Sequence, residues 1–133
     1  MALSTGDRLE IYEVLALHGH LMDAGDFDRL DEVFTQDFVY DLQPFGFGAL
    51  EGADALIEAS RALGDDNPLG HHVTNALVID GGGDRAMVRS KGLGIMADGS
   101  CGSVVYEDLL RRTSAGWRIA RRTVVPRRRP LQP

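Results

Sequence analysis

Two adjacent histidines, His71 and His72, open a segment with the pattern of a β-hairpin, "GHHVTNALVIDGGGDRAMV" over residues 70–88. Neighbouring side chains on a strand point to opposite faces, so only one of the two can face a covered interior. A histidine beside a buried carboxylate is a common general-base arrangement, because the carboxylate selects the tautomer and stabilises the imidazolium. The segment therefore contains a candidate base, and the pattern alone leaves open which histidine it is.

Asp23 is the carboxylate best placed to serve that base. It follows an apolar pair at the end of a predicted helix, where the helix dipole disfavours a negative charge. Its helical angle puts it near Tyr12 and Gly19, beside the inner stripe of that helix. Aspartate is also a frequent turn former, and "DAGD" at residues 23–26 has the composition of a turn. Spacing alone supports both interpretations equally.

Other chemistries find little support in the chain. Cys101 is the single cysteine, and its "DGSCGS" context indicates a turn, so no internal disulfide is possible and a nucleophilic role is disfavoured. His18 and His20 point in different directions on a helix, which does not suit metal binding. "DGGGD" at residues 80–84 lies between strand-like runs and opens no helix, so it is no phosphate loop. We expect neither a metal nor a cofactor.

Length and composition predict one folded domain over residues 1–133. With 44% hydrophobic and 26% charged residues, the chain is typical of a globular protein. Its net charge of −6 disfavours nucleic-acid binding, because affinity for phosphate backbones needs a basic surface. The apolar runs are too short to cross a bilayer, and the start lacks the pattern of a signal peptide. We therefore expect a cytoplasmic location without membrane association.

Hydrophobic periodicity predicts helices first and strands afterwards, an α+β pattern. The first helix is capped by Ser4 or Thr5, and its inner stripe contains Tyr12. The further elements expected are a short helix capped by Asp26 that includes Val33 and Phe34, a strand at 37–42, a loop containing Phe45 and Phe47, a helix at 52–63, and strands at 71–80, 85–97, 102–113 and 117–126. A curved antiparallel sheet wrapped around the N-terminal helices would form a cone with a pocket for a small apolar ligand. Residues 127–133 form a basic, proline-rich tail.

Four motifs, in order along residues 8–126, resemble those of SnoaL-like proteins in the nuclear-transport-factor-2-like (NTF2-like) superfamily. They are "LMDAGDFDRLDEVFTQDFVYD", "LEGADALIEA", "GHHVTNALVIDGGGDRAMVRS" and "YEDLLRRTSAGWRIARRTVVP". The resemblance is closest to the branch of scytalone dehydratase and hexachlorocyclohexane dehydrochlorinase. It implies an NTF2-like α+β barrel that works without a cofactor.

The resemblance also implies roles for particular residues. Members of this branch pair an aspartate at the end of the first helix with a histidine that opens the strand, which carries over to Asp23 and His71. A second polar residue lies five positions before the aspartate; here it is His18, where relatives tend to have tyrosine or lysine. An arginine after the final "GW" often reaches the pocket, and Arg122 or Arg121 fills that place. The remaining candidates for binding substrate are Tyr12, Tyr40, Phe45, Phe47 and Asn75.

These observations favour a cofactor-independent lyase or isomerase that acts on a small apolar or polyketide-like substrate. Dehydration, isomerisation, cyclisation and dehydrohalogenation all fit the layout. The alternative is a non-catalytic binding or assembly module, because one fold serves many functions. A dioxygenase β-subunit is disfavoured, because that role needs a longer surface. We also predict a homo-oligomer, a dimer or trimer, that packs through the strand face carrying His72, Thr74, Ala76 and Val78.

Overall fold

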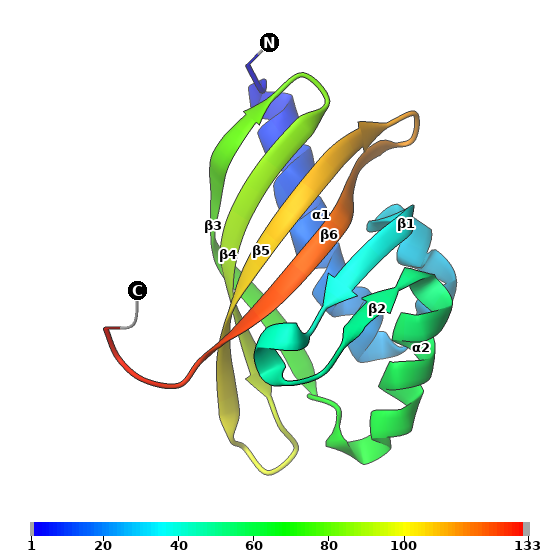
Figure 1. Cartoon of the computed structure of the whole chain (residues 1–133), viewed down its shortest axis with the longest axis vertical. Helices are drawn as coiled ribbons and strands as arrows, with labels where there is room; N and C mark the ends of the chain where they lie inside the picture. Colours follow the sequence, from blue (N-terminus) through cyan, green and yellow to red (C-terminus); the bar gives the residue numbers. More distant parts are fainter. Residues whose placement is uncertain (1, 132–133) are drawn as a thin grey trace.

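A computed structural model describes residues 2–131 and shows helices packed against one curved sheet (Figure 1). The helical elements are α1 (Thr5–Ala24), η1 (Phe27–Glu32), η2 (Gln43–Phe45), α2 (Gly52–Leu63) and η3 (Gly64–Asp66). The strands are β1 (Phe34–Asp41), β2 (Ala49–Glu51), β3 (Gly70–Gly82), β4 (Arg85–Ile95), β5 (Cys101–Thr113) and β6 (Gly116–Arg127). This is the NTF2-like α+β cone that the sequence predicted.

The six strands form a single sheet in the order β2-β1-β6-β5-β4-β3. β3 to β6 form an antiparallel meander, as expected, and β2 pairs antiparallel with β1. β1 runs parallel to β6, so the sheet is mixed, and it is mostly antiparallel as predicted. β1 precedes the meander in the chain and lies at its β6 edge.

α1 lies across the concave face of the long strands (Figure 1). Ser4 caps it through a capping box with Asp7, which satisfies two free amide groups of the first turn. Trp117 at the start of β6 fixes this end of the helix: its indole Nε1–H donates to Asp7, and its backbone N–H donates to Glu10. At the other end, Gly25 in the left-handed region (φ 66°) terminates the helix. The last turn of α1 is thereby held over the lower end of the sheet.

Two of the register shifts in the sheet lie beside residues of the predicted site; further shifts lie between Val78 and Asp80 of β3 and between Phe34 and Val39 of β1. The β3–β4 register shifts between Thr74 and Leu77, where Asn75 has a φ of 54°. The β5–β6 register shifts opposite Ala120, between residues 119 and 121 of β6. Each is a bulge, in which one extra residue reverses the alternation beyond it and bends the strand. These two shifts therefore decide which of the neighbouring predicted site residues can face the interior.

The bulge at Asn75 corrects the predicted oligomer face. His72 and Thr74 are exposed as expected, whereas Ala76 and Val78 are partly buried and pack against the core. The exposed apolar side chains on and beside this stretch are instead Leu77, Ile79, Met87 and Leu93. The oligomeric state itself stays a prediction.

One element boundary differs from the prediction, and one strand was not predicted. Val33 and Phe34 were expected on a short helix, but η1 ends at Glu32 and β1 begins at Phe34. Residues 49–51, for which the sequence predicted no element, form β2 at the sheet edge. No helix among residues 2–131 is long and apolar enough to span a bilayer.

Candidate active site

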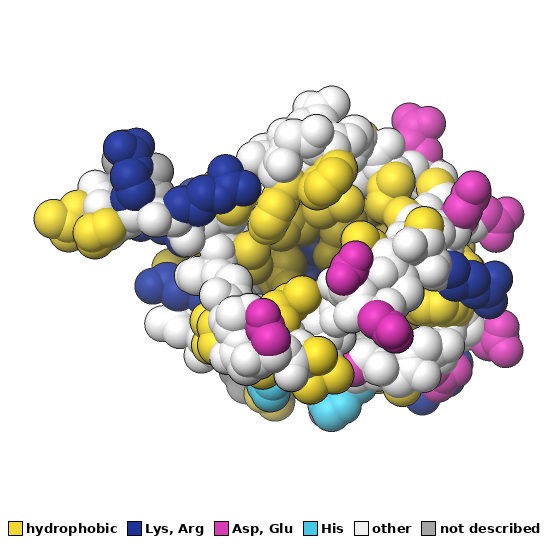
Figure 2. Space-filling view, turned by 90° about the horizontal axis from the view of Figure 1, so that it is seen from below, with side chains coloured by type: hydrophobic (Ala, Val, Ile, Leu, Met, Phe, Trp, Pro, Cys, Tyr) yellow, Lys and Arg dark blue, Asp and Glu magenta, His cyan; other side chains and the backbone are white. Residues whose placement is uncertain are grey.

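A cavity of about 480 Å³ opens at the lower end of the cone, between the last turn of α1, α2 and the β1–β2 hairpin. Seen from that end, hydrophobic side chains gather around a hollow (Figure 2). Its apolar lining includes Met22, Phe27, Leu42, Leu50, Leu56, Leu63 and Pro68. The polar groups are few, and they include Asp23, Tyr40 and His71. An apolar cavity with a few convergent polar groups is the usual form of a small-molecule site.

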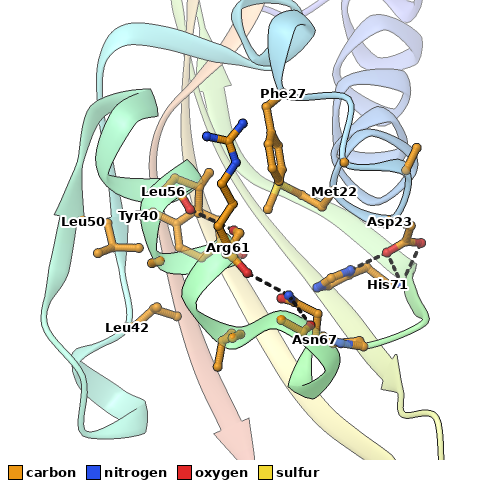
Figure 3. Close-up of a pocket in the computed structure, with 17 residues that line it drawn as sticks. Met22, Asp23, Phe27, Tyr40, Leu42, Leu50, Leu56, Arg61, Asn67 and His71 are labelled. Atoms are coloured by element: carbon orange, nitrogen blue, oxygen red, sulfur yellow. Dashed lines mark hydrogen bonds and ion pairs between the residues drawn. The ribbon is translucent and has the colours of Figure 1, made fainter.

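Asp23 and His71 form a close pair at the wall of this cavity. His71 Nδ1 lies 2.6 Å from Asp23 Oδ1, and the backbone N–H of His71 donates to both carboxylate oxygens at 3.1 and 3.0 Å. A carboxylate beside Nδ1 holds the ring proton there and leaves the Nε2 lone pair free. Figure 3 shows the ring extending from Asp23 into the cavity. The structure thus brings the predicted aspartate and histidine into direct contact at the cavity wall.

A close approach between α1 and β3 brings these two side chains together. Gly19 faces His71 one helical turn before Asp23, and a Cβ at residue 19 would lie 2.5 Å from the His71 carbonyl oxygen. Such a distance is far inside van der Waals contact, so only glycine lets the helix lie this near the strand. The sequence placed Gly19 on the inner stripe of α1, and the structure adds the reason that it is a glycine.

The alternation of side chains along β3 places His71 in the cavity and turns His72 to the opposite face. His71 is among the residues that line the cavity, and its side chain is 22% exposed, whereas His72 belongs to the exposed face of β3. The sequence pattern left open which histidine faces the interior, and in the structure it is His71. This is also the position that the family resemblance implies.

Behind the pair lies a buried aromatic and polar layer. His18 is 2% exposed, and its ring meets that of His71 edge-on at 5.9 Å between centroids. His18 Nε2 lies 3.4 Å from the hydroxyl of Tyr40, which lines the cavity. Tyr106 lies next to His18, with 6.2 Å between ring centroids. His18, predicted as the second polar residue of the site, therefore lies behind the cavity wall and contacts Tyr40, which lines the cavity.

Burial sets the protonation states of this layer. It lowers the pKa of His18 well below 6.5, with smaller contributions from the charges of Arg122 and His71, so His18 is neutral near pH 7. Burial also raises the pKa of Tyr40, and neighbouring Tyr106 adds to this, while Arg122 opposes it. Tyr40 therefore keeps its phenolic proton and can donate a hydrogen bond.

Arg122 faces inward, as one of the two alternatives predicted, because the bulge before it reverses the strand alternation. It is fully buried and binds Asp108 through two hydrogen bonds of 2.8 and 2.9 Å, with its guanidinium 4.0 Å from the Tyr106 ring centroid. Arg121 points outward to Asp41. Arg122 is not among the residues that line the cavity, so the expected direct contact with a ligand is not seen; its guanidinium lies beside Tyr106 instead.

The other predicted binding residues lie away from the cavity lining. Tyr12 is partly buried and packs against the core, and Phe45 packs there too, beneath the guanidinium of Arg128. Phe47 is 67% exposed. Asn75 lies exposed at the bulge, where asparagine tolerates a positive φ better than most residues. Asn75 therefore suits the backbone conformation of the bulge, and its side chain does not reach the cavity.

Sequence reasoning missed the contribution of α2 and η3. Ser60, Arg61 and Asn67 line the cavity opposite Asp23. Asn67 holds the turn after α2, since its side-chain amide donates to the carbonyls of Ser60 and Gly64. The amphipathic pattern of residues 52–63 predicted a helix. It did not indicate that this helix would pack at the open end of the cone and line the cavity.

No group of three or more His, Cys, Asp or Glu residues suited to a metal ion occurs in the described range, 2–131.

Comparison with known proteins identifies the family. A model of the SnoaL-like domain matches residues 4–123. The chain belongs to the SnoaL-like family. An uncharacterised Mycobacterium tuberculosis protein is 33% identical over 134 residues, which covers 87% of this chain and 82% of that protein.

Solved structures agree with this family assignment. A crystal structure from Novosphingobium aromaticivorans, provisionally named an aromatic ring hydroxylase, is 31% identical, with a TM-score of 0.80 and coverage of 99% of this chain and 94% of that one. LinA, the hexachlorocyclohexane dehydrochlorinase, is 19% identical, with a TM-score of 0.77 and coverage of 92% and 87%. The likeness to LinA shows the shared fold.

Proposed function

We propose that this SnoaL-like protein is a cofactor-independent acid–base enzyme, a lyase or isomerase, in which His71 removes a proton from carbon. The observation that carries the proposal is the 2.6 Å contact between Asp23 and His71 at the wall of an apolar cavity. The substrate is a small apolar molecule with an acidic C–H bond, because the lining offers a largely hydrophobic surface and few polar groups.

Proton abstraction begins at His71 Nε2. Asp23 accepts the hydrogen bond from Nδ1–H, and its charge stabilises the imidazolium that forms when Nε2 takes the proton. The backbone N–H of His71 also binds the carboxylate, which fixes the ring relative to the strand. A general base positioned in this way typically contributes about 10²–10⁴-fold to the rate.

Tyr40 stabilises, by a hydrogen bond, the negative charge that develops on the substrate. Its hydroxyl stays protonated and reaches the cavity, so it can donate to a carbonyl or leaving-group oxygen. Neutral His18, with its proton on Nε2, donates to the Tyr40 oxygen and orients the phenol. Arg122 and Asp108 hold this aromatic layer in place from behind.

Proton exchange tests the proposal without knowledge of the natural substrate. 2-Tetralone is apolar, of suitable size, and exchanges its α-protons through an enolate. In D2O, the wild-type protein should accelerate this exchange above the buffer rate, as followed by ¹H NMR. His71→Gln and Asp23→Asn should each reduce the protein-dependent rate by about 10²–10⁴-fold. The double variant should be little worse than either single one, because the two residues act as a unit.

His72→Gln is the matched control, because it removes the adjacent histidine from the exposed face of the same strand and should leave the exchange rate unchanged. If His72→Gln abolished exchange and His71→Gln kept the full rate, the base would be His72. If 2-tetralone bound in the cavity without any accelerated exchange, the non-catalytic binding module would be the better account of the fold.

A further inference from the structure

Arg61 is the one cationic side chain among the cavity-lining residues that carries a full charge at every physiological pH. It lies in the last turn of α2, across the cavity from Asp23. Its guanidinium lies 5.7 Å from the centroid of the Phe27 ring, which belongs to η1. Figure 3 shows it beside that ring, on a different wall from His71.

The guanidinium of Arg61 has no carboxylate partner within residues 2–131, which distinguishes it from the two arginines nearest the buried layer. Arg121 is bound by Asp41 and Arg122 by Asp108. The cation–π contact with Phe27 uses the face of the guanidinium and leaves its N–H edges unused. Arginine presents these donors in a planar fork that fits a carboxylate through two parallel hydrogen bonds.

The surroundings make this position selective. The protein carries a net charge of −6, and Asp65 and Asp66 lie exposed on η3, directly after α2. Such a surface repels anions in general. A single arginine at a largely apolar cavity would therefore attract an anionic group only when an attached hydrophobic body also fits the cavity.

We propose that Arg61 is the specificity residue of this site and that the ligand is an apolar molecule bearing one carboxylate. The carboxylate binds the fork of Arg61 while the hydrophobic body fills the space between Met22, Leu56 and Tyr40. That the other end of the ligand lies against His71 rests on the proposed acid–base function. The binding of the carboxylate by Arg61 does not depend on it.

A pair of near-isosteric ligands tests the proposal. 2-Naphthoate and 2-naphthamide differ mainly in charge, and their dissociation constants can be measured from ¹H–¹⁵N NMR titrations of the intact protein. Wild-type protein should bind 2-naphthoate about tenfold more tightly, which is at the low end for hydrogen bonds to charged groups because Arg61 is exposed. In Arg61→Gln the two affinities should become equal, through weaker binding of 2-naphthoate alone.

Arg89→Gln is the control, because Arg89 is exposed on β4, outside the cavity lining, and its removal changes the net charge equally. It should keep the tenfold preference. Equal affinities in the wild type, a preference that survives in Arg61→Gln, or failure of both probes to bind would each overturn the proposal. These results are independent of proton exchange, so a catalytically inactive cavity with an Arg61-dependent preference would refute only the acid–base function.

Discussion

Two pairs of oppositely ionisable side chains lie within the cone, and they differ in access to solvent. Asp23 and His71 are 28% and 22% exposed at the cavity wall. Arg122 and Asp108 are 1% and 0% exposed in the core. The first pair is open to a ligand in the cavity, whereas the second is enclosed behind aromatic rings. Burial therefore separates a pair that could take part in the proposed reaction from one that can only support the fold.

The electrostatics of the buried pair follow from its geometry. Arg122 and Asp108 are direct cross-strand neighbours on β6 and β5. Burial alone would lower the pKa of Arg122, but the charge of Asp108 and its hydrogen bonds outweigh this and raise it above its usual value. The charge on this arginine is therefore permanent, and its field acts on the tyrosines without a protonation change.

Breaking the buried pair should cause the largest loss of stability. Asp108→Asn leaves the guanidinium of Arg122 buried without a counter-charge, which costs about 3–5 kcal/mol in comparable cases. Asp23→Asn breaks a partly exposed pair and should cost less than about 1 kcal/mol. Urea unfolding of both variants measures the difference. Comparable losses in the two variants would contradict the contrast drawn between the pairs.

A double substitution sharpens this test. Arg122→Met with Asp108→Leu replaces both charges by apolar groups, and such replacements are often close to neutral. The double variant should therefore be more stable than Asp108→Asn. If it were less stable, the ion pair itself would contribute net free energy, and its role would extend beyond support of the aromatic layer.

The exposed pair depends instead on the approach of α1 to β3. Gly19→Ala would place a Cβ against the His71 carbonyl, so helix and strand must separate. We expect a loss of about 1–3 kcal/mol in unfolding free energy, typical of overpacking. The ¹⁵N chemical shifts of the His71 ring should also move, because the Nδ1–Asp23 contact lengthens.

Gly48→Ala is the matched control, because a Cβ there would meet no atom within 4 Å. It should change neither the stability by more than about 0.5 kcal/mol nor the histidine ring shifts. A Gly19→Ala protein with unchanged His71 shifts would show that the pair does not rely on this close approach.

The pairing of Asp23 with a histidine could be anticipated only by adding the family resemblance to the local patterns, because spacing alone explained Asp23 equally well as a turn former. The local patterns placed Asp23 at the end of a helix and the histidines at the start of an alternating strand. The order of helices and strands followed from periodicity for the same reason. Local patterns of this kind survive folding wherever the strand or helix is regular.

Two of the failures lie where the strands are irregular. Strict alternation from His71 would turn Asn75 toward the pocket, and the bulge at Asn75 reverses that alternation. Arg121 and Arg122 could not be separated because a second bulge precedes them. Sequence periodicity does not show where a residue will be inserted, since the insertion is determined by pairing with a distant strand. The position of α2, and hence of Arg61, depends on packing in the same way.

His18 provides the link between the two pairs and a test by pH. Its folded-state pKa is lowered by burial, whereas the unfolded chain protonates it near 6.5. Below pH 6.5 the unfolded state therefore binds a proton that the native state does not, and stability should fall as pH falls, by up to about 1.4 kcal/mol per pH unit. Above pH 6.5, His18 does not make the unfolding free energy depend on pH.

His18→Gln should remove this slope while keeping a polar group near Tyr40. Urea unfolding between pH 5 and 8 should therefore give curves for wild type and His18→Gln that run parallel above pH 7 and converge below 6.5, because only the wild type loses the His18 contribution. His20→Gln, on the exposed side of the same helix, should follow the wild type. Parallel curves for wild type and His18→Gln over the whole range would mean that His18 titrates normally in the folded protein. The hydroxyl of Tyr40 would then face a cation at low pH, and the assignment of a neutral His18 between the two pairs would have to be abandoned.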